Sequence, residues 1–291
     1  MKRHIQPLIN RGLLNLSIPD KPQSSKQKYK TTEKGLAFSC FLMYYLLENP
    51  HSKRSDMIVV GDLHGELDKL VKILKEFKDE RFLFIGDYCD SFTATDQEII
   101  DTLSLVMESK GIILSGNHEL NYFNSWGFNG YCSGYRSSLQ NRIVSPLIAN
   151  QNKFKIVHYE IETNILYSHA GISLQWLKST CPDIKETQNQ FDYIKQLELL
   201  NPFALSENHP VFAIGAARGG NSICGGPLWC DWYNDYEPLP WIRQIFGHTP
   251  IEKISTTYYK NKINSWNIDC LLYRNEVLEV CSTKRVKVRK F

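Results

Sequence analysis

Five short apolar runs in this chain each end in a small polar element, and this recurring junction constrains the fold more than any other feature. The runs are Met57–Val60, Phe82–Ile85, Gly111–Leu114, Ile165–Tyr167 and Ile245–Phe246. They lead into Gly-Asp, Gly-Asp, Gly-Asn-His, Ser-His-Ala-Gly and Gly-His, in that order. Apolar runs of this length, bounded by turn residues, are typical of buried strands. Ligands of open α/β sheets bind beyond the carboxyl ends of strands, so the junctions predict one convergent site.

Helical periodicity follows the first two of these runs. Glu66–Phe77 and Thr95–Met107 carry apolar residues at helical spacing, which predicts a helix after each strand and an α/β fold. Near the C-terminus, Ile268–Tyr273 and Val277–Cys281 are rich in β-forming residues, and we expect them to form an antiparallel hairpin. Residues 174–240 show the least regular pattern and are expected to cover the site.

Charge is unevenly distributed along the 291 residues, whose 42% hydrophobic content is ample for a large core. Residues 1–55 hold ten Lys/Arg against three Asp/Glu, and residues 284–291 hold five basic residues and no acidic one. We therefore expect a basic N-terminal extension over 1–55 with an apolar helix near 35–48, a central domain over 56–283 and a basic C-terminal tail over 284–291. Charge runs of this kind are usually solvated, so no stable nucleic-acid partner is expected.

The cysteines and the N-terminus bear on the compartment. None of the eight cysteines lies in a Cys-x-x-Cys pair, and a chain of this size needs no disulfides for its core. The N-terminus lacks the continuous apolar region of a signal peptide. The most apolar run, Leu36–Leu47, is too short to span a bilayer of about 30 Å as a helix. We expect a cytoplasmic protein without a transmembrane segment.

The polar residues at the strand ends have the composition of a metal centre. They are Asp62, His64, Asp87, Asn117, His169 and His248. Three imidazoles, two carboxylates and one amide oxygen suit first-row divalent metals such as Mn, Fe or Zn better than Ca or Mg. Six ligands exceed what one tetrahedral zinc takes, and they suit two metals about 3.5–4 Å apart. Such a pair can hold both the attacking and the leaving oxygen of an in-line displacement at phosphorus.

The elements GDLHGE (61–66), GDYCD (86–90), GNHE (116–119), SHAG (168–171) and GHTP (247–250) resemble those of the calcineurin-like metallophosphoesterases. The resemblance covers about residues 57–282. More narrowly, the chain is similar to the phosphoprotein phosphatase branch, which includes eukaryotic Ser/Thr phosphatases and bacterial and phage relatives. The resemblance implies a metallophosphoesterase domain over 56–283. It also implies a four-layer α/β/β/α sandwich with two mixed β-sheets and a site at the carboxyl ends of strands.

The resemblance also implies a role for each site residue. The first metal would be held by Asp62, His64 and Asp87. The second metal would share Asp87 as a bridge and take Asn117, His169 and His248. His118 would be the general acid that protonates the leaving alkoxide, Asp90 would orient it, and a hydroxide between the metals would be the nucleophile. Two divalent ions are expected, with Mn²⁺ as the first choice and Fe or Zn as the alternatives.

Two arginines of the family pattern are missing from this chain. The position after the second Asp of GDYCD and the position before GNHE hold Ser91 and Ser115. Both arginines normally bind the substrate phosphate, so phosphate recognition is expected to differ here. The substitutes we consider are Arg218 and Arg142, with Arg136 as a weaker candidate.

A further substrate-binding candidate lies in the irregular segment. Asp231, in Trp229-Cys230-Asp231, resembles the acidic residue of a family Trp-x-Asp element that lies near the attacking water. The Gly-rich stretch before it is more similar to bacterial-type members than to classical Ser/Thr phosphatases.

Three functions remain open from the sequence. The first is a dimetal-dependent phosphomonoesterase acting on phosphoserine or phosphothreonine proteins. The second is a hydrolase of dinucleoside polyphosphates or other nucleotide phosphates, in which the aromatic residues after GNHE (Tyr122, Phe123, Trp126, Phe128 and Tyr131) would form a base pocket rather than core. The third is a non-catalytic metal-binding scaffold, which the missing arginines suggest. The partner is accordingly a phosphorylated protein or a small phosphate ester.

Overall fold

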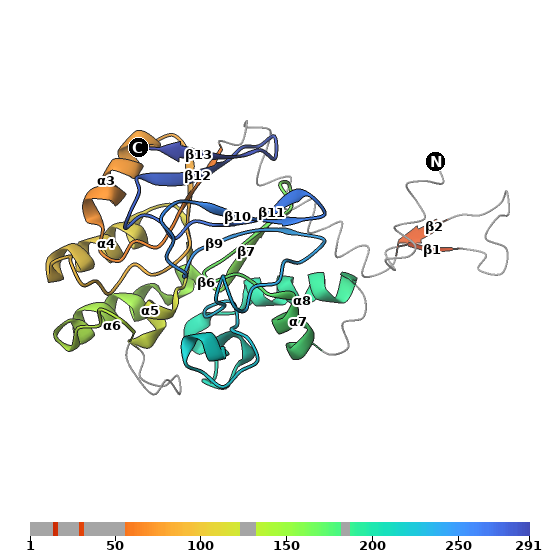
Figure 1. Ribbon diagram of the computed structural model, residues 1–291, viewed down its shortest axis with the longest axis horizontal. Helices are drawn as coiled ribbons and strands as arrows, with labels where there is room; N and C mark the ends of the chain where they lie inside the picture. The colour runs from red at the N-terminus through yellow and green to blue at the C-terminus, as the bar shows by residue number, and fades with distance from the viewer. Residues whose placement is uncertain (1–13, 17–28, 32–55, 123–131, 182–186) are drawn as a thin grey trace. The chain divides into compact units, whose positions relative to one another are not determined.

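The computed structural model describes residues 14–16, 29–31, 56–122, 132–181 and 187–291 (Figure 1). The chain divides into two compact units, Met1–Arg54 and Ser55–Phe291. In the first unit, β1 (Leu14–Leu16) and β2 (Tyr29–Thr31) form an antiparallel pair. The predicted apolar helix near 35–48 lies outside the described residues, and the predicted extent of the N-terminal extension stays a prediction.

The first sheet of the larger unit has the strand order β13-β12-β3-β4-β5-β6 in the described part of the chain. Its strands are β3 (Met57–Val60), β4 (Arg81–Phe84), β5 (Ile112–Leu114), β6 (Phe154–Lys155), β12 (Glu276–Val280) and β13 (Val286–Lys290). Strands β3 to β6 run parallel, whereas β12 pairs antiparallel with both β3 and β13. The first three predicted strands are therefore confirmed to within one residue at each end.

The second sheet has the order β10-β11-β9-β8-β7, again among the described residues. Its strands are β7 (Val157–Glu160), β8 (Ile165–Ser168), β9 (Arg243–Phe246), β10 (Ser255–Tyr259) and β11 (Lys262–Asn267). The central strands β8, β9 and β11 are parallel, and both edge strands are antiparallel to their neighbours. The sheet is mixed, like the first.

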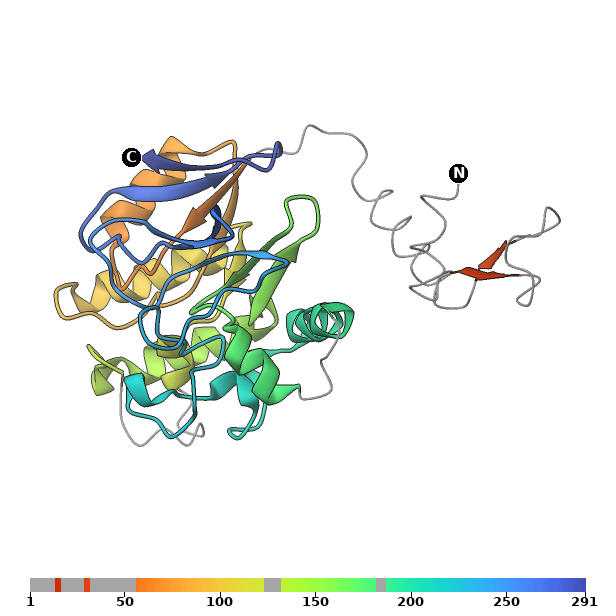
Figure 2. The same cartoon turned by 45° about the vertical axis from the view of Figure 1, so that its right-hand side comes forward.

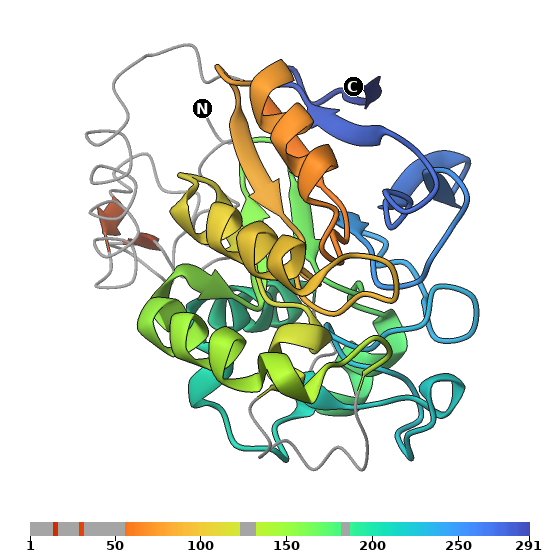
Figure 3. The same ribbon diagram turned by 90° about the vertical axis from the view of Figure 1, so that its left-hand side faces the viewer.

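Helices cover the outer faces of the two sheets. On the first sheet lie α3 (Leu67–Glu76), α4 (Asp96–Glu108) and α6 (Gln140–Asn150), which Figure 3 shows side by side. On the second lie α7 (Leu174–Thr180) and α8 (Thr187–Leu199). Figure 2 shows the two helical groups on opposite sides of the stacked sheets. The predicted helices after β3 and β4 are confirmed, and a capping box between Thr95 and Glu98 begins the second of them.

The layer between the sheets is apolar. Met57, Val59 and Leu83 of the first sheet meet Tyr167 and Ile245 of the second in one buried cluster. Because the strands of both sheets alternate their side chains, the opposite faces pack against the helices. This arrangement confirms the predicted four-layer α/β/β/α sandwich with two mixed sheets.

Short elements connect the layers. Helix α5 (Asn117–Asn121) directly follows β5. The 3₁₀ turns are η1 (Ser137–Leu139), η2 (Gln151–Lys153), η3 (Pro202–Ala204), η4 (Pro210–Phe212) and η5 (Ala216–Arg218). In the described part of the chain, no helix combines the length and the apolar character needed to cross a bilayer.

Two expectations near the C-terminus are wrong. Residues 268–273 and 277–281 do not form a hairpin, because β11 ends at Asn267 in the second sheet and β12 begins at Glu276 in the first. Nor is 284–291 a tail: Val286–Lys290 is β13, paired along its whole length with β12. Its basic side chains are held by an acidic neighbour, since Glu279 of β12 accepts an ion pair from Lys287 at 3.0 Å and another from Arg289.

Candidate metal centre

The polar residues of the five junctions meet at one place, between the carboxyl ends of strands from both sheets. From the first sheet come the residues after β3, β4 and β5, and from the second come those after β8 and β9. Contacts join the two groups: the backbone N–H of His248 donates to Asp62 Oδ2 at 3.0 Å, and His169 Nε2 lies 2.9 Å from Asn117 Oδ1. The convergence predicted from the strand ends is therefore present in the fold, although the ligand roles of these residues remain a proposal.

The backbone at this site takes a conformation that most residues avoid. Positive φ angles occur at His64 (42°), Asp87 (53°), Asp90 (61°) and His248 (70°). Left-handed backbone is unfavourable for residues with a Cβ, and it persists where surrounding structure enforces it, commonly at functional sites. The strained geometry turns these side chains inward from the ends of their strands.

Glycines of the junctions make room for the carboxylates. A Cβ on Gly247 would lie 2.0 Å from Asp62 Oδ1, and a Cβ on Gly116 would lie 2.0 Å from Asp87 Oδ1. On Gly86, which also has a φ of 118°, it would lie 2.8 Å from His169 Nδ1. Glycine is thus required at these positions because the acidic and imidazole groups occupy the space of a side chain.

Backbone carbonyls fix the orientation of two of the imidazoles. Nδ1 of His64 lies 2.9 Å from the carbonyl oxygen of Asp90, and Nδ1 of His169 lies 3.0 Å from that of Ile85. A carbonyl oxygen only accepts, so each Nδ1 carries the proton and each Nε2 keeps its lone pair for the site. Histidines that bind metals are commonly oriented in this way.

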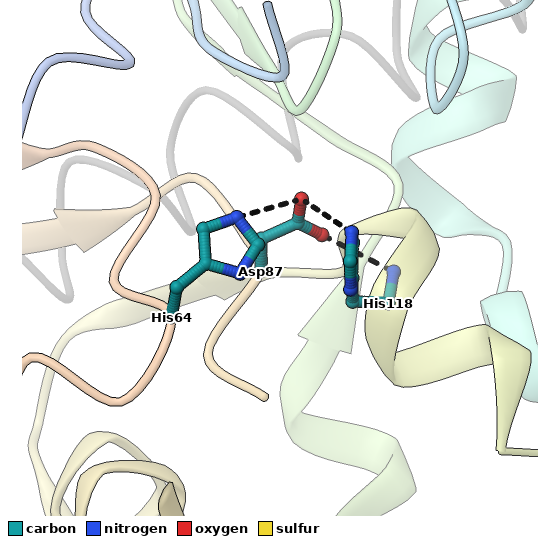
Figure 4. Close-up of side chains that lie close together, drawn as sticks. All are labelled: His64, Asp87 and His118. Atoms are coloured by element: carbon teal, nitrogen blue, oxygen red, sulfur yellow. Dashed lines mark hydrogen bonds and ion pairs between the residues drawn. The ribbon is translucent and has the colours of Figure 1, made fainter. Parts of the chain in front are cut away.

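The carboxylate of Asp87 lies at the centre of the imidazoles. Its Oδ2 is 3.7 Å from His64 Nε2, 3.8 Å from His118 Nε2 and 3.4 Å from His169 Nε2. Figure 4 shows His64 and His118 on either side of this carboxylate. Two groups of ligand atoms result, His64 with Asp87 and His118, and Asp87 with His169 and His248, each within 4.8 Å. Asp87 belongs to both groups.

The residues present fit divalent cations. Asp62 Oδ1 is buried and has no hydrogen-bond partner in the described structure, although a buried carboxylate oxygen is costly to leave unpaired. Burial raises the pKa of both Asp62 and Asp87, and neighbouring acids, Asp269 among them, raise both further. Burial also lowers the pKa of His169 and His248, which keeps these imidazoles neutral. Neutral imidazoles and an unpaired buried carboxylate oxygen are donors that suit metal binding.

His118 and Asp90 form a hydrogen-bonded pair beside this donor set. Nδ1 of His118 lies 2.9 Å from Asp90 Oδ2, and the hydroxyl of Tyr122 donates to Asp90 Oδ1. Burial raises the pKa of Asp90 to about 7, against the effect of the Tyr122 hydrogen bond. Burial and the charge of His64 lower the pKa of His118 to about 3. The predicted pairing of Asp90 with His118 is thus present as geometry, with Nε2 of His118 turned toward Asp87.

Glu119 is a buried site residue that the sequence analysis did not single out. Its carboxylate accepts the backbone N–H groups of Asp87 (3.0 Å), Tyr88 (2.7 Å), Cys89 (3.1 Å) and Gly116 (2.9 Å). It therefore fixes the loop that carries Asp87 to the start of α5. The sequence does contain a signal for this role, because Glu119 in GNHE is an acidic residue one helical turn after a glycine N-cap.

Cys132 was also missed. Asn117 donates a hydrogen bond from Nδ2 to the sulfur of Cys132 at 3.3 Å. This contact turns Asn117 Oδ1 toward His169. Burial raises the pKa of the Cys132 thiol, so it remains protonated. Nothing in the sequence links a cysteine 15 residues away to this asparagine.

The three arginine candidates lie in different places. Arg218, at the end of η5, pairs through Nε with Asp231 Oδ2 at 3.0 Å and donates from Nη2 to Thr249 Oγ1 at 2.7 Å. Arg218 therefore lies next to His248, and the predicted Arg218 and Asp231 contact each other. Arg142 is exposed on α6, where it donates to Gln97, and no contact among the described residues joins it to the donor set. We therefore drop Arg142 as a substrate-binding candidate.

Arg136 has a structural role near the site. It pairs with Asp96 at 2.5 Å and donates to the carbonyl oxygens of Ser91 and Ala94. It thus holds the loop that follows Asp90. Ser91, one of the two residues in place of a family arginine, accepts the backbone N–H groups of Thr93 and Ala94 in the same loop. Ser115, the other, is fully buried.

Comparison with known proteins gives the family context. Residues 56–252 match the family described as calcineurin-like phosphoesterase. Over 90 residues the chain is 33% identical to a protein phosphatase 2A catalytic chain of Dictyostelium discoideum, a match that covers 29% of each protein. Over 81 residues it is 35% identical to serine/threonine-protein phosphatase 7 of Arabidopsis thaliana, covering 25% of this chain and 20% of that protein. The chain thus spans less than a third of these relatives.

Among solved structures, similarity extends to a protein serine/threonine phosphatase from Saccharomyces cerevisiae. The TM-score is 0.47 at 14% identity, and the alignment covers 100% of this chain and 96% of that one.

Proposed function

This chain belongs to the calcineurin-like phosphoesterase family, and on that premise we propose that it hydrolyses phosphate monoesters of serine and threonine in proteins, with two divalent metal ions. The observation that carries the proposal is the position of Asp87, whose Oδ2 lies within 3.8 Å of three imidazoles from two ligand groups. One shared carboxylate between two groups is the arrangement of a dinuclear site.

The proposed ligand assignment is the one that the family resemblance implies, and the unpaired Oδ1 of Asp62 supports the inclusion of that residue. Asp62, His64 and Asp87 would hold one ion. Asp87, Asn117, His169 and His248 would hold the other. When bound, two such ions would lower the pKa of a water and neutralise charge on the phosphoryl oxygens. Mn²⁺ is the ion we propose first, with Fe or Zn as alternatives, because imidazole and carboxylate together suit all three.

His118 is the proposed general acid. To act as an acid, the ring must carry a proton on each nitrogen, against the effect of burial on its pKa, and Asp90 would hold the proton on Nδ1. As the P–O bond breaks, the proton on Nε2 passes to the leaving alkoxide oxygen. An alkoxide is a strong base, so its departure from phosphorus needs this proton more than the departure of a phenolate does.

Arg218 is the proposed phosphate-binding residue. An ion pair with Asp231 at Nε and a hydrogen bond from Nη2 to Thr249 position the guanidinium, and neither Nε nor Nη1 donates a hydrogen bond to a described residue. A guanidinium fixed in this way, close to His248, presents a donor to an anion without further loss of rotamer freedom. It would take the place of the arginines that Ser91 and Ser115 replace.

A second candidate function is hydrolysis of a dinucleoside polyphosphate. The observation that favours it is Tyr233, which is 71% exposed two residues after Asp231 and therefore offers a ring for a base near the proposed phosphate site. The cytoplasmic location and the role of residues 1–55 stay predictions from the sequence.

The test measures turnover with Mn²⁺ of a phosphoserine peptide, as released phosphate, and in parallel of diadenosine tetraphosphate, as the adenine nucleotides formed when its phosphate bridge is hydrolysed. We expect turnover of the peptide at the higher kcat/KM, no turnover by Asp62→Asn, and unchanged turnover by Arg142→Ala. Preference for the dinucleotide would replace the protein substrate with a nucleotide. Absence of turnover on both, with metal bound, would favour the non-catalytic scaffold.

A further inference from the structure

Tyr122 lies against the Asp90–His118 pair in a way that core packing alone does not require. Its side chain is 1% exposed, and its hydroxyl donates to Asp90 Oδ1 while His118 Nδ1 occupies Asp90 Oδ2. Each oxygen of the buried carboxylate therefore has one side-chain partner. A carboxylate bound at both oxygens cannot rotate about its Cβ–Cγ bond without losing a hydrogen bond.

Neighbouring residues fix Tyr122 in turn. It is the residue that ends α5, the short helix that also carries Asn117 and His118. Gln140 donates from Nε2 to the carbonyl oxygen of Tyr122 at 2.6 Å, and Tyr135 donates its hydroxyl to Gln140 Oε1 at 2.8 Å. The rings of Tyr122 and Tyr135 pack with centroids 5.1 Å apart. The hydroxyl is therefore held at one position relative to Asp90.

We propose that Tyr122 is a positioning residue for the general acid: its hydroxyl locks the Asp90 carboxylate, and through it the His118 ring, in the orientation that points Nε2 at the leaving group. The inference rests on the proposed function, in which His118 protonates the leaving oxygen. Tyr122 keeps its own proton throughout. Only the proton on His118 Nε2 moves, to the oxygen released from phosphorus, while Asp90 retains the hydrogen bond to Nδ1.

The proposal predicts an effect that depends on the leaving group. Tyr122→Phe keeps the ring and its packing but removes the hydrogen bond to Asp90. For a phosphoserine peptide, whose alkoxide needs the proton, kcat should fall about tenfold, the loss expected for one hydrogen bond to a charged group. For p-nitrophenyl phosphate, whose phenolate leaves without help, kcat should fall less than about twofold. KM should stay unchanged for both substrates.

Tyr236→Phe is the matched control. Tyr236 is a half-buried tyrosine whose hydroxyl also has a side-chain partner, Ser265 Oγ, and no contact joins it to Asp90 or His118 in the described structure. It should leave the ratio of the two kcat values as in the wild type. An equal fall in kcat for both substrates in Tyr122→Phe, or no fall in kcat for either, would overturn the proposal.

A measurement without turnover separates this proposal from the proposed function. In metal-free protein labelled with ¹⁵N-histidine, two-bond couplings report which ring nitrogen of His118 carries the proton. We expect a single Nδ1–H tautomer in the wild type and a mixture of tautomers in Tyr122→Phe. Unchanged His118 couplings in the variant would overturn the positioning role. If the wild type hydrolysed neither substrate while the couplings changed as expected, the proposed function would fail and the positioning role would stand.

Discussion

The donor set at the strand ends and the Arg218–Asp231 pair both hold charge at the same site, but they are built differently. His169 of the donor set has a fully buried side chain at the end of β8, whereas the Arg218 side chain is 25% exposed at the end of a 3₁₀ turn. The donor set depends on strand register, strained φ angles and glycine contacts. The arginine depends on contacts with loops. The difference teaches that the geometry of the proposed metal ligands depends on the strands of the fold, whereas the geometry of the proposed phosphate-binding arginine depends on the loops.

The largest effect is expected at the residue that joins the two ligand groups. Asp87→Asn removes the shared carboxylate while keeping its size, so both ions lose a ligand at once. Activity on any phosphate monoester should fall at least about 1,000-fold, because the ions supply both nucleophile activation and charge neutralisation. Bound Mn, measured by mass spectrometry of dialysed protein, should drop with it. Retention of two tightly bound ions would contradict the shared role.

A smaller effect is expected at His118, for which we propose an acid role rather than a ligand role. His118→Asn should lower kcat for a phosphoserine peptide about 100-fold, the usual share of general acid catalysis. The bound metal content should stay at the wild-type value. Loss of metal in this variant would instead make His118 a ligand, as its place in a group with His64 and Asp87 allows.

Substitution of the arginines should lower activity less than these changes, and only the change at Arg218 should lower it. Arg218→Ala should lower kcat/KM at least about tenfold through loss of a charged hydrogen bond to the phosphate, with the bound metal unchanged. Arg142→Ala, which removes the same charge from the exposed face of α6, should stay within about twofold of the wild type. Equal effects of the two changes would mean that net charge, and not a fixed guanidinium, attracts the substrate.

The smallest effect on activity is expected at Glu279 of β12, next to the edge strand β13 of the first sheet. Hydrogen bonds from the Cys281 thiol and from the cations Lys287 and Arg289 lower the pKa of Glu279 to about 2. A carboxylate with a lowered pKa stabilises the folded state at pH values above the ordinary glutamate pKa. This contribution is lost as the pH falls toward 2. Glu279→Gln should therefore lower unfolding stability by about 1 kcal/mol at neutral pH, with turnover unchanged.

Urea unfolding of both proteins at several pH values checks this prediction. The difference between wild type and Glu279→Gln should shrink as the pH falls below about 4.5. A difference that does not depend on pH would mean that packing, and not charge, accounts for the loss.

The strand ends could be predicted from the sequence because each depends on a few adjacent residues. In Met57–Val60, an apolar run of strand length ends at Gly61-Asp62, and the structure places the strand end there. Parallel strands bring their carboxyl ends to one edge, so convergence follows from topology. The arginine could not be chosen in the same way, since Arg136, Arg142 and Arg218 are distinguished by their contacts with distant segments of the chain.

Other features were beyond the sequence because they depend on contacts between distant segments. The apolar pattern of 268–281 is typical of a hairpin, yet Asp269 and its neighbours cross from one sheet to the other. The partners of Glu119 are backbone groups, which leave no trace in residue identity. The contacts of Cys132 with Asn117 and of Tyr122 with Asp90 join side chains, and only the folded chain shows them.

The central claim is that the Asp87 carboxylate joins two divalent ions, and electron paramagnetic resonance of Mn²⁺-loaded protein tests it most directly. With two equivalents of Mn²⁺, the account predicts the signal of an exchange-coupled pair in the wild type and the six-line signal of isolated ions in Asp87→Asn. Isolated-ion signals in the wild type at full loading, or binding of a single ion per chain, would contradict the claim.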